Sequence, residues 1–137
     1  MEGDQGIEKI EKDGKIFAIV VRGAFDKQGC TFVSPESFPL QLGLHKRKAK
    51  EHVKLHRHIP FKELRDIPIQ EFVYIESGSI KVAFYDNNKK LSTKILNSKD
   101  MVLMNCAHEV IFLEDTKMVE LKQGPYRGKD AEKEYFG

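Results

Sequence analysis

Residues 70–86, QEFVYIESGSIKVAFYD, hold two short apolar runs on either side of a Ser-Gly pair. Phe72–Ile75 and Ile80–Tyr85 are rich in the β-branched and aromatic residues that favour strands. Ser77-Gly78, which lies between them, is typical of a tight turn. This stretch therefore predicts one strand, a turn and a second strand.

Short strands are predicted along the rest of the chain as well. Gly, Asn, Asp and Ser separate apolar or alternating runs at intervals of about 8–12 residues, and no segment sustains a helical period. We expect about eight to ten strands and an all-β sandwich or barrel. Outside the opening stretch, the expected strands are Ile16–Val21, Cys30–Val33, Leu40–Leu44, Glu51–His58, Ser92–Leu96, Met101–Met104, Val110–Leu113 and Met118–Leu121.

The chain has the length of one domain, and its charges are nearly balanced. Its 137 residues contain no repeat or linker that would divide them, so we expect a single domain over residues 1–137. Lys and Arg number 23, and Asp and Glu number 21. This balance argues against a nucleic-acid partner, because nucleic-acid-binding proteins usually carry a clear basic excess.

Three further features favour a cytoplasmic protein with no membrane partner. No apolar run approaches the ~18 residues of a membrane span. The polar, acidic start over residues 1–15 is unlike a secretory signal. Cys30 and Cys106 are far apart in the sequence, and two unpaired thiols are typical of a reducing compartment.

The histidines form the most informative cluster. The chain has 5 histidines, and His52, His56 and His58 fall close together. If residues 51–58 form a strand, His56 and His58 project to one face, and His52 joins them if the strand is unbroken. One strand cannot complete a coordination sphere, so further ligands would come from later strands, which Glu71 and His108 open.

Three imidazoles and one carboxylate suit one divalent transition metal: Zn, Fe, Mn, Ni or Co. Such a set leaves room for water or substrate at the ion. The alternative is that His56 and His58 are ordinary solvated side chains. Lys46-Arg47-Lys48 and Lys50 lie nearby and are compatible with a basic surface on which the histidines are incidental.

Two motifs resemble those of cupins. His56-Arg57-His58 followed by Glu71, six residues and Gly78 resembles the first cupin motif, HxH…E(x)6G. Residues 99–108, KDMVLMNCAH, resemble the second motif, whose histidine completes a metal site. Residues 39–48, 70–86 and 119–128 also look like a group of small bacterial cupins that occur alongside surface-polysaccharide and nucleotide-sugar enzymes.

The resemblance covers about residues 38–128 and leaves polar extensions at both ends. It implies a cupin-type jelly-roll β-barrel of six to eight strands. It also implies a metal inside the barrel, held by His56, His58, Glu71 and His108, and a homodimer.

The chain departs from both motifs. Twelve residues, Ile59–Gln70, separate the HxH motif from Glu71, where cupins have three or four. We expect them to form a loop over the barrel mouth, and its Glu63 or Asp66 could replace Glu71 as the carboxylate ligand. In the second motif, Leu103 and Asn105 stand where cupins have Pro and Gly, although Asn also suits a tight turn.

The expected pocket combines apolar walls with a polar mouth. Counting every second residue places Val73 and Ile75 inward with Glu71, and Val110 and Phe112 inward with His108. Such a pocket fits a small polar ligand, for example a sugar. The candidate ligand-binding residues near the mouth are Gln41, His52, Lys54, Gln70, Lys122, Gln123 and Tyr126.

The function expected for this pocket is sugar isomerase or epimerase chemistry. A metal would polarise a carbonyl or hydroxyl group of the ligand, and Glu71 or His52 would move a proton. Three alternatives remain open: Fe(II)-dependent dioxygenase chemistry, a sugar-binding or regulatory protein without turnover, and a metal that only stabilises the fold.

Overall fold

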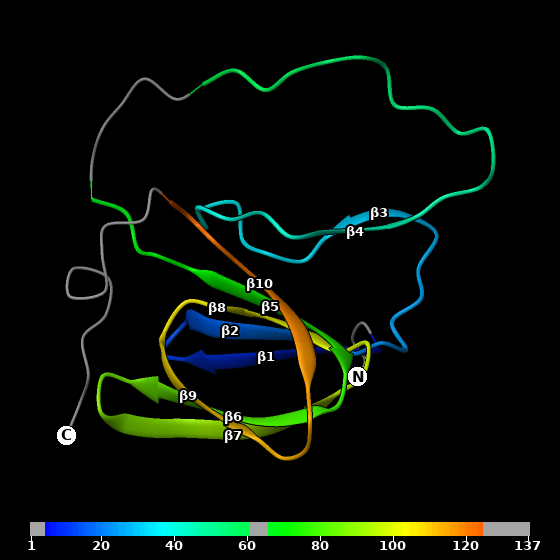
Figure 1. The fold of residues 1–137 in the computed structure, drawn as a ribbon. Coiled ribbons are helices and arrows are strands. Elements are labelled where there is room, and N and C mark those ends of the chain that lie inside the picture. The colour runs from blue at the N-terminus through cyan, green and yellow to red at the C-terminus, as the bar shows by residue number, and fades with distance from the viewer. Residues whose placement is uncertain (1–4, 61–65, 125–137) are drawn as a thin grey trace.

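The computed structural model describes residues 5–60 and 66–124, and none of these lies in a helix (Figure 1). The all-β prediction is confirmed for these residues. No described segment is therefore a helix long and apolar enough to cross a membrane. The strands are β1 Ile7–Lys12, β2 Lys15–Val21, β3 Gly29–Phe32, β4 Gly43–Lys46, β5 Glu71–Ser77, β6 Ser79–Asp86, β7 Lys89–Asn97, β8 Met101–Met104, β9 Ala107–Phe112 and β10 Lys117–Lys122.

The strands form three antiparallel sheets. The largest has the order β1-β2-β8-β5-β10, the second has the order β7-β6-β9, and β3 pairs with β4. These sheets are not joined into one closed barrel in the described part of the chain. The finer expectation of a cupin jelly roll therefore stays a prediction.

The predicted turn at Ser77-Gly78 carries the chain from one sheet to another. β5 belongs to the five-stranded sheet and β6 to the three-stranded sheet. Gly78 has a φ of 95°, and a Cβ atom there would collide with the backbone oxygen of Asp115. Only glycine meets both requirements without strain.

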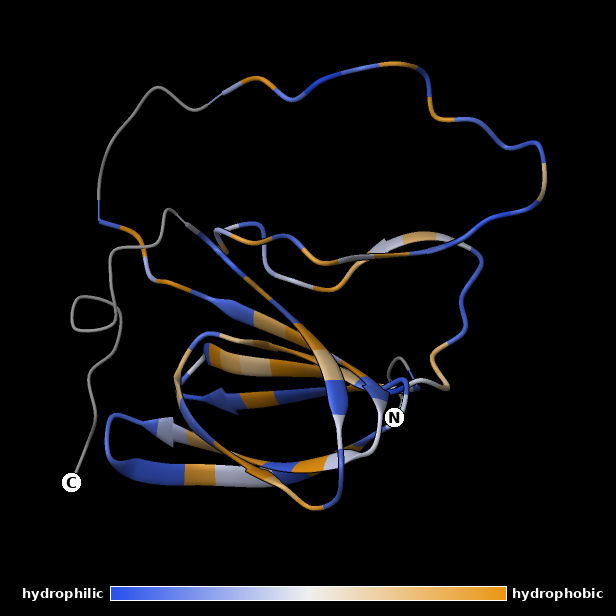
Figure 2. Cartoon of the chain, viewed as in Figure 1, coloured by the Kyte–Doolittle hydropathy of each residue, from blue (hydrophilic) through white to orange (hydrophobic). Residues whose placement is uncertain are grey.

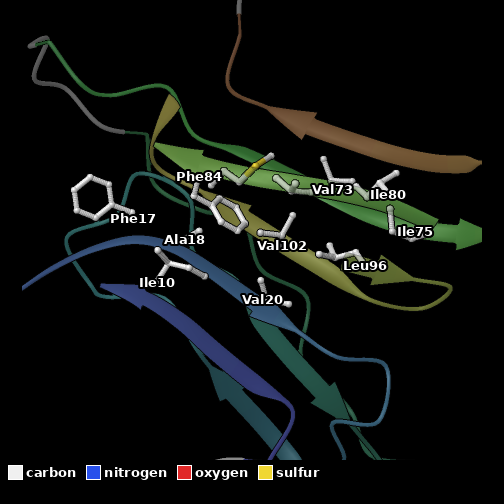
Figure 3. Packing of buried hydrophobic residues seen from close by; sticks show 12 residues of the cluster. Ile10, Phe17, Ala18, Val20, Val73, Ile75, Ile80, Phe84, Leu96 and Val102 are labelled. Carbon is white, nitrogen blue, oxygen red and sulfur yellow. The ribbon is translucent and has the colours of Figure 1, made fainter. Parts of the chain in front are cut away.

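The core lies between the inner faces of the two larger sheets (Figure 3). Val20, Val102 and Val73 are register partners on β2, β8 and β5, and all three are buried. Residues of β6 and β7 cover this row from the opposite sheet, with Phe84 and Leu96 both 0% exposed. Burial of such side chains is the main favourable contribution to folding.

β2 is buried on both faces, which explains why IFAIVV reads as a continuous apolar run. Ala18 and Val20 belong to the core, whereas Ile19 and Val21 face the other side of the sheet and are also buried. β4 and the loop that follows β2 border this outer face. A strand that is buried on both faces does not need to alternate apolar with polar residues.

Three details of the predicted elements were wrong. β1, which pairs with β2, was not among the predicted strands, and only Ile10 of this strand is buried. The strand expected at residues 40–44 begins at Gly43 instead. Phe112 shares the core-facing side of β9 but is 56% exposed, so it does not form part of the inner wall.

The strand predicted at residues 51–58 is also absent. No described strand pairs with this segment, and Val53 and Leu55 are 64% and 100% exposed. Its alternating pattern is that of a strand, but a single extended segment has no ladder of hydrogen bonds to stabilise it.

Phe84→Ala should lower the free energy of unfolding by about 3–5 kcal/mol, because it leaves a cavity between the two sheets. Phe112→Ala is the matched control, since this ring is 56% exposed. It should cost less than about 1 kcal/mol. Urea denaturation of the two variants measures both values, and equal losses would contradict this description of the core.

Candidate functional site

Glu71 and His108 meet inside one end of the sandwich, although 36 residues separate them in the sequence. Glu71 begins β5 in the five-stranded sheet, and His108 lies opposite Phe84 on the core-facing side of β9. Nε2 of His108 is 3.4 Å from Oε1 of Glu71, and their side chains are only 26% and 22% exposed. The sheets thus unite two of the four predicted metal ligands.

The hydrogen bond made by the second ring nitrogen of His108 shows which of its two nitrogens keeps its proton. Nδ1 is 2.9 Å from the carbonyl oxygen of Cys106. A carbonyl only accepts hydrogen bonds, so Nδ1 carries a hydrogen and donates it. Nε2 is then the nitrogen that gains or loses a proton, and it faces the Glu71 carboxylate. His108 can therefore act as an acid at Nε2.

Each member of the pair shifts the pKa of the other. Hydrogen bonding to His108 lowers the pKa of Glu71 below its ordinary value, while burial opposes this effect. Hydrogen bonding to Glu71 raises the pKa of His108, again against the effect of burial. The arrangement therefore favours a carboxylate beside an imidazolium, which is a base and an acid held next to each other.

β10 adds two charged side chains that the sequence analysis did not assign to catalysis. Lys122 is the register partner of Glu71, and Glu120 is the register partner of core residue Val73, so both lie on the inner side of the sheet. Lys122 lowers the pKa of Glu71, and Glu120 raises the pKa of His108. Glu120 was missed, although a charged residue on the inward side of the apolar strand MVEL was a signal.

Gln70 and Gln123 are next to Glu71 and Lys122 in the sequence, but their side chains bond to Leu40 and Pro68 and not to the Glu71–His108 pair. Gln70 is 0% exposed; its Oε1 accepts a hydrogen bond from the Leu40 backbone, and its backbone N–H donates to Oε1 of Gln123. The buried Nε2 of Gln70 has no hydrogen-bond acceptor among the described groups. Because the Gln70 side chain bonds to the segment that leads to β4, it lies on the outer side of the sheet and is not part of the Glu71–His108 site.

The other predicted ligand-binding residues are placed differently. The side-chain amide of Gln41 donates to the carbonyl oxygens of Pro35 and Phe38, which holds its own loop together. His52 and Lys54 lie in the exposed segment 47–60, and Asp66 is exposed. Tyr126 and Glu63 lie outside the described residues.

His56 and His58 lie close to each other but apart from Glu71 and His108. Their ring centroids are 5.3 Å apart, and both residues are exposed in segment 47–60. The described residues contain no group of three His, Cys, Asp or Glu side chains placed to share a metal ion. The four predicted ligands thus form two separate pairs in a single chain, and the metal site stays a prediction.

A cleft of about 560 Å³ lies on the opposite, outer face of the five-stranded sheet. Phe72, Tyr74 and Met101 line it from the sheet, and Leu42 and Leu44 line it from the other side. Among its described lining residues the one carboxylate is Asp26, which is paired with Lys46. None of the described residues that line this cleft form an acid–base pair like that of Glu71 and His108. The inner site is therefore the stronger candidate for catalysis.

Comparisons with protein-family models, curated proteins and solved structures find no match for this chain.

The ion pair should stabilise the protein in a defined pH range. Stability from the lowered pKa of Glu71 is present above its ordinary value of 4.5 and is lost as pH falls through the lowered pKa. Stability from the raised pKa of His108 is present below 6.5 and is lost as pH rises through the raised pKa. The pair should therefore contribute most between these two ordinary values.

Glu71→Gln should lower the pKa of His108, because the neutral amide no longer stabilises the imidazolium. NMR titration of the histidine Cε1–H signals measures this pKa in the wild type and the variant. Glu109→Gln is the control, since Glu109 is exposed on the adjacent position of β9. An unchanged His108 pKa in Glu71→Gln would show that the two side chains do not interact.

Proposed function

We propose that this chain binds a small polar molecule, such as a nucleotide-linked keto-sugar, between β5, β9 and β10 and transfers protons on it. The observation that carries the proposal is the half-buried pair of Glu71 and His108, with Nε2 and Oε1 3.4 Å apart. The reaction class is that of isomerases and epimerases. The sequence resemblance to small cupins found with surface-polysaccharide enzymes supports the choice of substrate.

Glu71 is the proposed base and His108 the proposed acid. The Glu71 carboxylate removes a proton from the hydroxyl-bearing carbon next to the substrate carbonyl, and Nε2 of His108 protonates the carbonyl oxygen. The product of this half-reaction is an enediol, which leaves Glu71 protonated and His108 neutral. Return of the Glu71 proton to the former carbonyl carbon, and of the other hydroxyl proton to His108, moves the carbonyl by one position.

The surrounding groups suit such a reaction. The positive charge of Lys122 stabilises a negative charge that develops on substrate oxygen near Glu71. The apolar core beneath the pair keeps water away from one side, which strengthens these interactions.

A divalent transition metal would supply a Lewis acid for the same carbonyl. The proposed ligands remain His56, His58, Glu71 and His108. They do not converge in a single chain, so no step of the proton transfer described here depends on a metal. Because Nδ1 of His108 donates to Cys106, Nε2 is the nitrogen that would bind the ion, and a bound metal would then replace His108 as the acid. The metal is therefore a separate proposal with its own test.

Glu71→Gln and His108→Gln should each lower kcat by about 10²–10⁴-fold, which is the usual contribution of a general acid or base. The assay is isomerisation of a panel of nucleotide-linked keto-sugars, followed by NMR of the products. Glu109→Gln should retain kcat, because this carboxylate contacts Tyr85 outside the site. Tight binding with unchanged ligand, or equal activity of the Glu71→Gln and Glu109→Gln variants, would contradict the proposed function.

Elemental analysis of the purified protein tests the metal proposal. We expect one transition-metal ion per chain in the wild type and its loss in the double variant His56→Ala and His58→Ala. His45→Ala is the control, because this histidine contacts Cys30 and Arg47 on another part of the surface. A metal-free wild-type protein that still isomerises a substrate would show the metal proposal wrong and the acid–base proposal right.

A further inference from the structure

The proposed proton transfer does not use the cleft on the outer face of the five-stranded sheet. The sheet forms one wall of this cleft, and the β3–β4 hairpin, residues 29–46, forms the wall that faces it. Figure 1 shows the hairpin on the side of the sheet away from β6, β7 and β9. Alternate residues of β5 point to opposite faces, so the cleft and the Glu71–His108 pair are separate sites.

Hydrogen bonds hold the hairpin wall in place. Oε1 of the buried Gln70 accepts a hydrogen bond from the backbone of Leu40 at 3.1 Å, which joins the hairpin to the residue before β5. Within the hairpin, the backbone of Leu42 donates to Oγ of Ser34, and the backbone of Val33 donates to the carbonyl oxygen of Leu42. A wall that is already ordered lowers the entropic cost of binding a ligand.

The side chains that line the cleft from both walls are largely apolar. Figure 2 shows hydrophobic positions on the hairpin and on the sheet that faces it. The cleft volume of about 560 Å³ lies within the range of small-molecule sites. The apolar part of a small ligand can therefore leave water between the two walls. The half-buried apolar lining residues include Phe72, Tyr74, Met101, Leu42 and Leu44.

Basic side chains outnumber acidic ones around this cleft. Among its described lining residues the one carboxylate is Asp26, which forms an ion pair with Lys46. The Arg22 guanidinium is bonded to carboxylates of β1 and of the turn before β8. No described carboxylate pairs with the ammonium groups of Lys27 and Lys99. Two positive charges are therefore available to an anionic ligand.

The backbone holds Lys99 firmly at the cleft. Its φ is 76°, which is uncommon for a residue with a side chain. Its N–H donates to the carbonyl oxygen of Ile75 at 2.7 Å, and a Cβ atom at Gly23 would lie only 2.7 Å from the Cβ atom of Lys99. Because these contacts fix the backbone of Lys99, only its side chain has to be ordered when an anion binds.

We propose that this cleft binds a small carboxylate with an apolar body, such as an aliphatic carboxylic acid of medium length. The apolar body lies between Phe72, Tyr74 and Leu44, and the carboxylate pairs with Lys99 and Lys27. An apolar cation is disfavoured, because the same two lysines repel it. A small anion without an apolar body leaves the lining of the cleft in water. The proposal goes beyond the proton transfer, since it concerns the opposite face of the sheet.

Isothermal titration calorimetry with three probes tests the class of ligand. Octanoate should bind about tenfold or more tightly than butyrate, because its longer chain buries more apolar surface. Octylammonium has an apolar chain of the same length and the opposite charge, and it should bind about tenfold or more weakly than octanoate. Octanoate affinity should also fall as salt is added. Equal affinities of octanoate and octylammonium would contradict the role of the lysines.

Lys99→Asn tests the proposed charge contact. Asn tolerates a positive φ better than Lys does, so the variant should keep its melting temperature while octanoate binds about three- to tenfold more weakly. Lys50→Asn is the matched control: Lys50 also has a φ of 76° but does not line the cleft. Its octanoate affinity should equal that of the wild type, and equal losses in the two variants would contradict the proposal.

NMR of methionine methyl groups tests the location. Octanoate should shift the Met101 signal, since Met101 lines the cleft, and should leave Met118 unchanged, since that side chain packs against the core on the inner side of β10. The Met101→Leu and Met118→Leu variants assign the two signals. A shift of Met118 alone, or the absence of saturable octanoate binding, would overturn the inference. Neither result depends on turnover, so both leave the proposed isomerase chemistry to its own assay.

Discussion

Burial of apolar side chains between the five-stranded and three-stranded sheets is the constraint on which the other features of this molecule depend. β2, β8 and β5 present Val20, Val102 and Val73 in register to the rings and aliphatic chains of β6 and β7. Because this packing holds the two sheets face to face, it also determines which later residues on the same strands can meet. Glu71 precedes Val73 on the inner side of β5, and His108 precedes Val110 on the inner side of β9.

The chemistry of the site follows from its place at the end of that apolar interior. Solvent reaches only about a quarter of the Glu71 and His108 side chains, so the attraction between them is less screened than on the surface. The carbonyl of Cys106 holds the imidazole in one orientation, which leaves Nε2 to exchange its proton with Glu71 or a ligand. The ends of two strands thus hold the two groups side by side, and the turn between β8 and β9 supplies the carbonyl that orients the imidazole.

At the opposite end of the sandwich, the charged side chains form hydrogen bonds with one another and with the backbone. Arg22 donates hydrogen bonds to Glu8 and Asp100, and Asp100 accepts further bonds from the backbone of Gly23 and Asn97. These bonds connect the ends of β1 and β2 with the turn before β8, so they serve the fold. At the Glu71 end, the buried amide of Gln70 has no acceptor among the described groups, and the edge of β10 has no described partner strand.

The sequence alone determined the fold class and most of the strands, because strand formation depends on local side-chain type and on a two-residue period that can be read directly. Met101–Met104 was predicted with the bounds of β8, and the inward positions of Val73 and Ile75 were confirmed. Pattern alone could not place residues 51–58, whose alternation is that of a strand, since a strand also requires an edge to pair with. The sequence pattern also gave no clear indication of β1, because Ile10 is the one buried residue of this strand.

Only the tertiary structure decided how the polar residues combine. Glu71 and His108 were both candidates from the sequence, but their distance depends on the packing of two sheets and on the long-range register of β5, β9 and β10. The same packing added Glu120 and Lys122 to the pair and left His56 and His58 on another surface of the chain. Residue type follows from the sequence, whereas proximity between distant residues is a property of the folded chain, because it is set by long-range strand pairing and core packing.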